Sequence, residues 1–163
     1  MHMTIGIITF GENKPIARDV AKGILADMLG EGNQPFDYGN ETGKTVSVKG
    51  DIGRRIISRC MRATTAEFLQ SIKNVRRHLE QFTDKQLATS ELIVGTGEDE
   101  LDSTGMAKFW MYKAGQYKGN TIYLYDNDGE GIRTREHLTN ALRQWSKPVK
   151  GQKVYVTPFD VNY

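Results

Sequence analysis

Hydrophobic and polar positions along the first part of the chain predict a strand followed by a helix. Residues 4–10 are β-branched and aromatic, which is typical of a buried strand, and Gly11 ends that pattern. Asn13 is a candidate N-cap, and Pro15 stands where the first turn of a helix accepts proline. The apolar residues that follow recur at helical spacing: Ile16, Val20, Ile24 and Met28.

The middle of the chain changes period twice. Residues 33–44 are polar and contain glycine, which predicts a loop, and residues 45–49 form a short strand candidate. Residues 56–61 indicate one or two helical turns. Residues 64–67 match a capping box, so a separate helix is expected to begin there. Its apolar stripe consists of Phe68, Leu69, Ile72, Val75, Leu79 and Phe82.

The last third returns to the strand-and-helix pattern. Residues 121–125 predict a buried strand, residues 126–131 a turn, and the apolar positions of 138–145 a helix. Residues 154–156 predict a closing strand that ends before Pro158.

Alternating strands and helices predict an α/β fold: a Rossmann-like, mostly parallel sheet flanked by helices. A length of 163 residues fits a single compact domain over residues 3–163, with an unassigned insertion around residues 64–119. Met1 and His2 are left out as a possible cloning scar. The chain has one cysteine, Cys60, so we expect no internal disulfide and a reducing, cytoplasmic location without a membrane segment.

Charge is unevenly distributed although the formal net charge is only +2. Residues 49–82 hold eight basic and three acidic side chains, and residues 91–102 hold five acids and no base. Such runs are commonly solvated faces, but a basic stretch is also the usual electrostatic signature of nucleic-acid binding.

The densest chemical signal is the acidic turn after the predicted strand 121–125. Asp126, Asp128 and Glu130 alternate with glycine and asparagine, and ligands bind beyond the carboxyl ends of strands in open parallel sheets. Oxygen ligands suit a hard cation, so we expect Mg²⁺ there. Glycines at positions 129 and 131 allow a sharp turn.

Three alternatives compete with a magnesium site. A calcium loop would place a bidentate glutamate where His137 stands, and would follow a helix rather than a strand. A haloacid-dehalogenase-like phosphatase also begins with a strand and Asp-x-Asp-Gly, but only 37 residues (163 − 126) follow Asp126. An acidic surface turn without function is the third alternative.

The order of several segments resembles Toprim domains, especially those of type IA DNA topoisomerases. The strand and acidic turn, followed by His137 and Leu138, resemble the Asp-x-Asp motif of that family. The stretch at residues 12–20 is similar to the family's Glu-containing helix start. Residues 46–54 and 154–160 resemble the connecting strand and the closing strand. In two departures, Gly129 stands where topoisomerases commonly have arginine, and Glu12 lies two residues beyond the strand.

The resemblance implies a function and a set of site residues. Glu12, Asp126 and Asp128 are the expected catalytic residues; with Glu130 they are the candidate ligands of Mg²⁺, whose chemistry is transfer or hydrolysis of phosphodiesters. The residues expected to contact DNA or RNA are Lys14, Arg18, Arg54, Arg55, Arg59 and His137.

Two function classes follow, and a third is weaker. The first is a Mg²⁺-dependent enzyme that nicks or hydrolyses nucleic acid; strand passage is not expected, because the chain lacks the further domains of a topoisomerase. The second is a Toprim-like regulator that has lost catalysis and binds nucleic acid or a protein. The third is an inhibitor that binds a host protein through its charged faces. No phosphate-binding loop or dinucleotide motif is present, so no nucleotide cofactor is expected.

Overall fold

The structure is a computed structural model, and it describes residues 2–30, 35–80, 83–85, 122–145 and 151–162. The chain divides into two compact units. The first comprises Met1–Thr64 and Ile122–Tyr163, and the second comprises Thr65–Thr121. The sheet and most of the described helices belong to the first unit. The acidic run at 98–102 and the aromatic residues at 109–117 lie outside the described residues.

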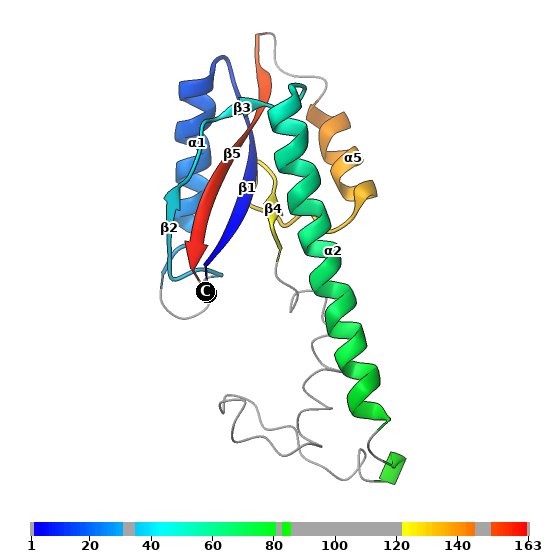
Figure 1. The fold of residues 1–163 in the computed structure, drawn as a ribbon. Coiled ribbons are helices and arrows are strands. Elements are labelled where there is room, and N and C mark those ends of the chain that lie inside the picture. The colour runs from blue at the N-terminus through cyan, green and yellow to red at the C-terminus, as the bar shows by residue number, and fades with distance from the viewer. Residues whose placement is uncertain (1, 31–34, 81–82, 86–121, 146–150, 163) are drawn as a thin grey trace. The chain divides into compact units, whose positions relative to one another are not determined.

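The sheet of the first unit is built on one long strand pair (Figure 1). Strands β1 (His2–Gly11) and β5 (Lys153–Asn162) pair antiparallel along ten residues each. Strand β4 (Leu124–Tyr125) runs parallel to β1 on its other edge. Strands β2 (Tyr38–Glu41) and β3 (Val46–Ser47) follow each other along the free edge of β5, both antiparallel to it. The order is therefore β2-β5-β1-β4, with β3 also paired to β5.

The prediction of a mixed α/β fold is confirmed, but the sheet formed by the described strands is mostly antiparallel, not mostly parallel. Only β1 and β4 run in the same direction. The alternation of strands and helices in the sequence gives the order of elements. It does not give the direction in which a strand enters the sheet, and β5 enters antiparallel to all three strands that it pairs with.

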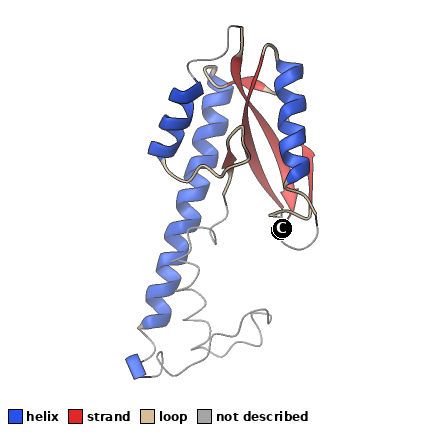
Figure 2. Cartoon of the chain, turned by 180° about the vertical axis from the view of Figure 1, so that it is seen from behind, coloured by secondary structure: helices blue, strands red, loops and turns tan. Residues whose placement is uncertain are grey.

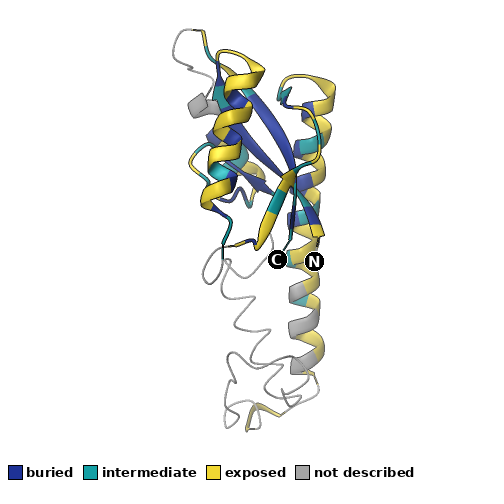
Figure 3. Cartoon of the chain, turned by 90° about the vertical axis from the view of Figure 1, so that its left-hand side faces the viewer, coloured by how far each residue is buried: buried dark blue, intermediate teal, exposed yellow. Residues whose placement is uncertain are grey.

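Helices cover both faces of the sheet (Figure 2). Helix α1 (Lys14–Asp27) packs on one face, with Met3, Ile5 and Ile7 of β1 in the same core cluster. Helices α2 (Asp51–Leu79) and α5 (Arg135–Trp145) contribute to a second core cluster on the other face. Because helices cover both faces of the sheet, β1 is apolar on both sides, and its sequence is a nearly continuous hydrophobic run. Figure 3 shows the strands largely buried and the outer faces of the helices exposed.

Helix α1 begins as predicted, and its packing face overlaps the predicted stripe only in part. Asn13 is its N-cap: the side-chain oxygen accepts the Ile16 N–H at 3.1 Å. Ile16 and Val20 remain 43% and 38% exposed. The buried residues are Ala17, Ala21, Leu25 and Met28, and Ile24 packs against the same core cluster, so Ile24 and Met28 of the predicted stripe do meet the core. The two alanines let the first half of the helix approach the sheet closely.

Helix α2 runs without a break through the predicted capping box, so the expectation of two separate helices is wrong. Thr64 lies inside the helix, where its hydroxyl donates to the Cys60 carbonyl at 3.1 Å. The same hydroxyl oxygen accepts the N–H of Tyr123 at 3.2 Å, just before β4. Thr64 therefore bonds to the preceding helical turn and to the sheet instead of capping a new helix.

Strand β5 continues through Pro158, where the sequence pattern predicted its end. At the pair between Pro158 and Gly6, the N–H of Gly6 points away to the Tyr123 carbonyl. The proline nitrogen therefore faces the other edge, in the gap between β2 and β3, where Glu41 pairs with Phe159 and Val46 with Val156. No ladder hydrogen bond is lost there, so the strand tolerates proline.

Two smaller differences concern the segment before α2. Residues 38–41 form strand β2, although their polar composition predicted a loop. The strand expected at residues 45–49 is confirmed but shortened to β3. In the described part of the chain, no helix has the length and apolar character needed to cross a membrane.

Candidate nucleic-acid interface

The predicted acidic turn lies beside the end of β1. The parallel register pairs Gly6 with Leu124 and Ile7 with Tyr125, so both strands run toward the same edge of the sheet, and β1 continues beyond the end of β4 to Gly11. The link is direct, because the Phe10 N–H donates to the side-chain oxygen of Asn127 at 3.2 Å. The turn also folds back, since the Ile132 N–H donates to the Leu124 carbonyl at 2.8 Å.

Asp126 closes this turn from inside. Its side chain is 8% exposed, and Oδ1 accepts the backbone N–H of Asp128 at 3.0 Å and of Glu130 at 2.9 Å. Two backbone bonds complete the loop, from the Asp126 N–H to the Glu130 carbonyl at 2.9 Å and from the Gly129 N–H to the Asp126 carbonyl at 3.1 Å. One carboxylate oxygen of Asp126 therefore holds the loop in shape.

Gly129 has a backbone conformation that an L side chain rarely adopts. Its φ is +78°, and a Cβ there would lie 3.3 Å from Met28 Cε and 3.5 Å from Ile24 Cγ2. An arginine, which topoisomerases commonly have at this position, would be strained. The backbone conformation at this position therefore favours glycine in this chain.

The predicted metal ligands do not gather in the described structure. Glu12 is exposed beyond the end of β1. If the register continued, Asp126 would stand opposite Ile8, four residues before Glu12, which corresponds to roughly 13 Å along a strand. Among the described residues, no three His, Cys, Asp or Glu side chains are placed to hold an ion. The Mg²⁺ site therefore stays a prediction.

Arg18, a predicted phosphate contact, is engaged within the protein. Its guanidinium donates twice to Glu41 Oε2, from Nε at 2.8 Å and from Nη2 at 2.6 Å. Lys22 Nζ lies 3.6 Å from the same oxygen. The hydrogen bond and the positive charge of Arg18 lower the pKa of the Glu41 carboxyl, and Glu41 raises the pKa of Arg18. This cluster joins α1 to β2.

Two other predicted contacts stand near helix starts. Lys14 is exposed at the first residue of α1. His137 is partly buried in the first turn of α5, where its backbone N–H donates to the Thr134 hydroxyl at 3.0 Å. Thr134 therefore caps α5, although the sequence analysis did not single it out.

The remaining predicted cations lie on α2. Arg54 donates from Nε and Nη2 to the Lys49 carbonyl, at 2.9 and 2.6 Å, and so ties the start of the helix to the preceding turn. Arg55, Arg59 and Arg62 are all exposed and recur at i, i+4 and i+7, which places them on one face of the helix. No acid among the described residues forms an ion pair with these three side chains.

In the second unit, α2 has three further exposed cations among the described residues: Lys73, Arg76 and Arg77.

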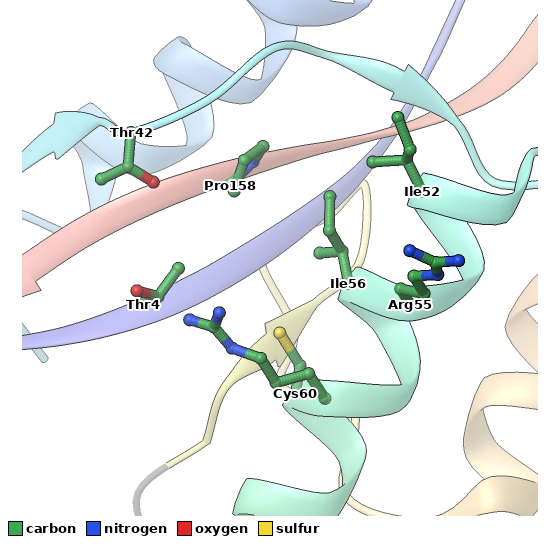
Figure 4. Close-up of a pocket in the computed structure, with 8 residues that line it drawn as sticks. Thr4, Thr42, Ile52, Arg55, Ile56, Cys60 and Pro158 are labelled. Carbon is green, nitrogen blue, oxygen red and sulfur yellow. The ribbon is translucent and has the colours of Figure 1, made fainter.

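A hollow of about 340 Å³ opens beside this arginine face, within the first unit (Figure 4). Ile56 and Cys60 extend from α2 toward the strands, while Thr4 and Thr42 face them from the strand side. Pro158 of β5 lies between the two threonines and the helix. No sequence pattern indicated this hollow, because its residues come from four separate segments.

Comparison with known proteins gives a family and no function. A search of curated proteins and a search of solved structures found no match to the chain. One family model, described as a domain of unknown function (DUF7995), matches residues 35–163. That match begins before β2, includes α2 and continues to the end of β5. Because the model covers well over half of its residues, the chain belongs to the DUF7995 family.

Proposed function

We propose that this protein is a Toprim-like nucleic-acid-binding protein that contacts phosphodiester backbones through the arginine face of α2. The observation that supports the proposal is the contrast between two sets of cations. Arg18 and Lys22 share one acidic partner, Glu41, on one side of the sheet. The cations Arg55, Arg59 and Arg62 are exposed on the other side without an acidic partner among the described residues.

Exposed arginines in a row suit a phosphate backbone for a physical reason. A guanidinium presents several donors in a plane and binds phosphate oxygens in a bidentate way. Binding of this kind releases counterions, so it weakens steeply as salt is added and depends little on sequence. We therefore expect affinity for DNA and RNA of unrelated sequence.

A salt titration tests the proposal. Fluorescence anisotropy with a labelled 20-base-pair duplex gives the slope of log K against log salt for the wild type and for Arg59→Gln and Arg62→Gln. Each substitution should reduce the magnitude of this slope by roughly 0.9, the value for one phosphate contact on duplex DNA. Lys22→Gln is the matched control, because it removes the same charge from α1 on the opposite face.

Two results would contradict the proposal. One is wild-type protein that does not bind at about 50 mM salt. The other is a slope that Lys22→Gln lowers as much as Arg59→Gln does, because only overall charge would then matter.

Mg²⁺-dependent cleavage is the second candidate function. It is favoured by one observation, namely that β1 and β4 are parallel neighbours whose carboxyl ends lead to Glu12 and to the acidic turn. Supercoiled DNA and structured RNA incubated with Mg²⁺ test it, with Asp128→Asn as the variant, because the Asp128 side chain is exposed. We expect cleavage by the wild type and not by the variant. Intact substrates with the wild type would refute cleavage and leave the binding proposal standing.

A further inference from the structure

The hollow beside α2 has two positive charges and no negative one among its lining residues. Arg55 and Arg59 both line it, one helical turn apart. Two guanidinium groups in one hollow match a ligand group of about two negative charges. A phosphomonoester has ≈ −1.5 to −2 charge near neutral pH, whereas each phosphodiester of a strand has −1. The charge of the hollow therefore favours a terminal phosphate over an internal one.

The rest of the lining suits the body of a nucleotide. Ile56 and Pro158 offer apolar surface, and the hydroxyls of Thr4 and Thr42 offer donors and acceptors for a sugar or a base edge. Burial raises the pKa of the Cys60 thiol to about 11, so the thiol is neutral at physiological pH and does not repel an anion. A volume of about 340 Å³ lies at the small end of ligand sites, which limits the occupant to a single residue-sized molecule.

We propose that this hollow binds the phosphorylated terminal nucleotide of a nucleic-acid strand, with its phosphomonoester between Arg55 and Arg59. The proposal rests on the proposed function and makes it more specific: the arginine face of α2 holds the backbone, and the hollow selects a phosphorylated end. Arg62 belongs to the arginine face but does not line the hollow, so the two roles are separable.

The test compares three single strands of one sequence, about 12 nucleotides long. One has a 5′-phosphate, one has a 3′-phosphate and one has neither. Anisotropy at constant salt should show at least one phosphorylated strand binding about tenfold more tightly than the unphosphorylated strand. Arg55→Gln combined with Arg59→Gln should abolish this preference. Arg62→Gln should lower the affinity for all three strands by the same factor and keep the preference for the phosphorylated strand.

A second variant fills the hollow without removing charge. Thr42 is exposed and its backbone N–H bonds to the Pro158 carbonyl, so Thr42→Phe retains that bond and places a ring over the opening. It should abolish the preference and leave duplex binding unchanged. Circular dichroism of each variant checks that the fold is intact.

The outcomes separate this inference from the proposed function. Equal affinity for the three strands, with arginine-dependent duplex binding, would overturn the hollow as a phosphate site and leave the proposed function standing. A preference that survives Thr42→Phe would also overturn it. A free nucleotide has the same phosphomonoester group as a strand end, and adenosine monophosphate tests whether the hollow binds it instead. The protein could bind this free nucleotide, lose that binding in the Arg55 and Arg59 variant, and bind none of the strands. That result would refute both the strand as ligand and the proposed function.

Discussion

Removal of the Asp126 side chain should unfold the acidic turn and destabilise the first unit. Oδ1 accepts two backbone N–H groups, from Asp128 and Glu130, and the side chain is 8% exposed. Asp126→Ala leaves both donors without this partner. A hydrogen bond to a charged group contributes about 1.5–3 kcal/mol, so with partial rehydration of the freed donors we expect a loss of about 2–4 kcal/mol in the free energy of unfolding. Asp126→Asn retains the Oδ1 acceptor and should cost only about 1 kcal/mol.

Urea unfolding followed by circular dichroism measures these differences. Asp128→Ala is the matched control in the same turn, because its carboxylate is exposed and its backbone N–H remains in place; it should change stability by no more than about 0.5 kcal/mol. If Asp126→Ala cost no more than Asp128→Ala, Asp126 would not hold the loop and the structural role assigned to it would be wrong. If Asp126→Asn cost as much as Asp126→Ala, the negative charge rather than the acceptor geometry would stabilise the turn.

Three further predictions concern packing and pH. A Cβ on Gly53 would overlap the Ser47 carbonyl oxygen, so Gly53→Ala should cost more than about 2 kcal/mol. Gly23→Ala, with no atom within 4 Å of the added Cβ, should stabilise the protein by about 0.5–1 kcal/mol, and urea unfolding of both variants shows whether the signs differ. Burial raises the pKa of Cys60 to about 11 from an ordinary value of 9.0. The contribution of the neutral thiol to the free energy of unfolding is therefore complete below pH 9 and is lost as the pH rises toward 11. The loss is about 2–3 kcal/mol, and a Cys60→Ala protein with the same alkaline slope as the wild type would contradict it. The pKa of Glu41 is lowered, so the contribution of its carboxylate to the free energy of unfolding is present above about pH 4.5 and is lost on further acidification. Glu41→Gln should therefore flatten the acid side of the curve of stability against pH. An unchanged curve would argue against the ion pair.

Local sequence patterns correctly predicted the elements that form because of their own residues, such as β1 and the start of α1. The run of β-branched residues in β1 is buried on both faces, and the N-cap and proline of α1 lie within the segment that begins the helix. The capping box predicted at Thr64 is wrong because the Thr64 hydroxyl makes other hydrogen bonds in the fold. It donates to the Cys60 carbonyl and accepts the N–H of Tyr123, which lies 59 residues away in the sequence. No local pattern contains that contact.

For the candidate site, the sequence indicated which residue types are present, while the tertiary structure decided which of them are accessible. Arg18 and Arg59 look alike in the sequence, since both lie on helices and both were predicted to bind phosphate. Folding places Glu41 beside Arg18 and places no acid among the described residues in an ion pair with Arg59. A side chain's availability depends on what the rest of the chain brings next to it.

The sequence by itself determined that β1 and β4 are buried strands, that an acidic turn follows β4, and that basic residues concentrate within residues 49–82. Each of these depends on neighbours within a few positions, where the periods of strand and helix act. Only the tertiary structure decided that β5 enters antiparallel, that Asp126 turns one oxygen inward, and that Thr4, Thr42 and Pro158 meet α2 around a hollow. Those outcomes depend on packing between segments far apart in the chain, and packing is a property of the whole fold.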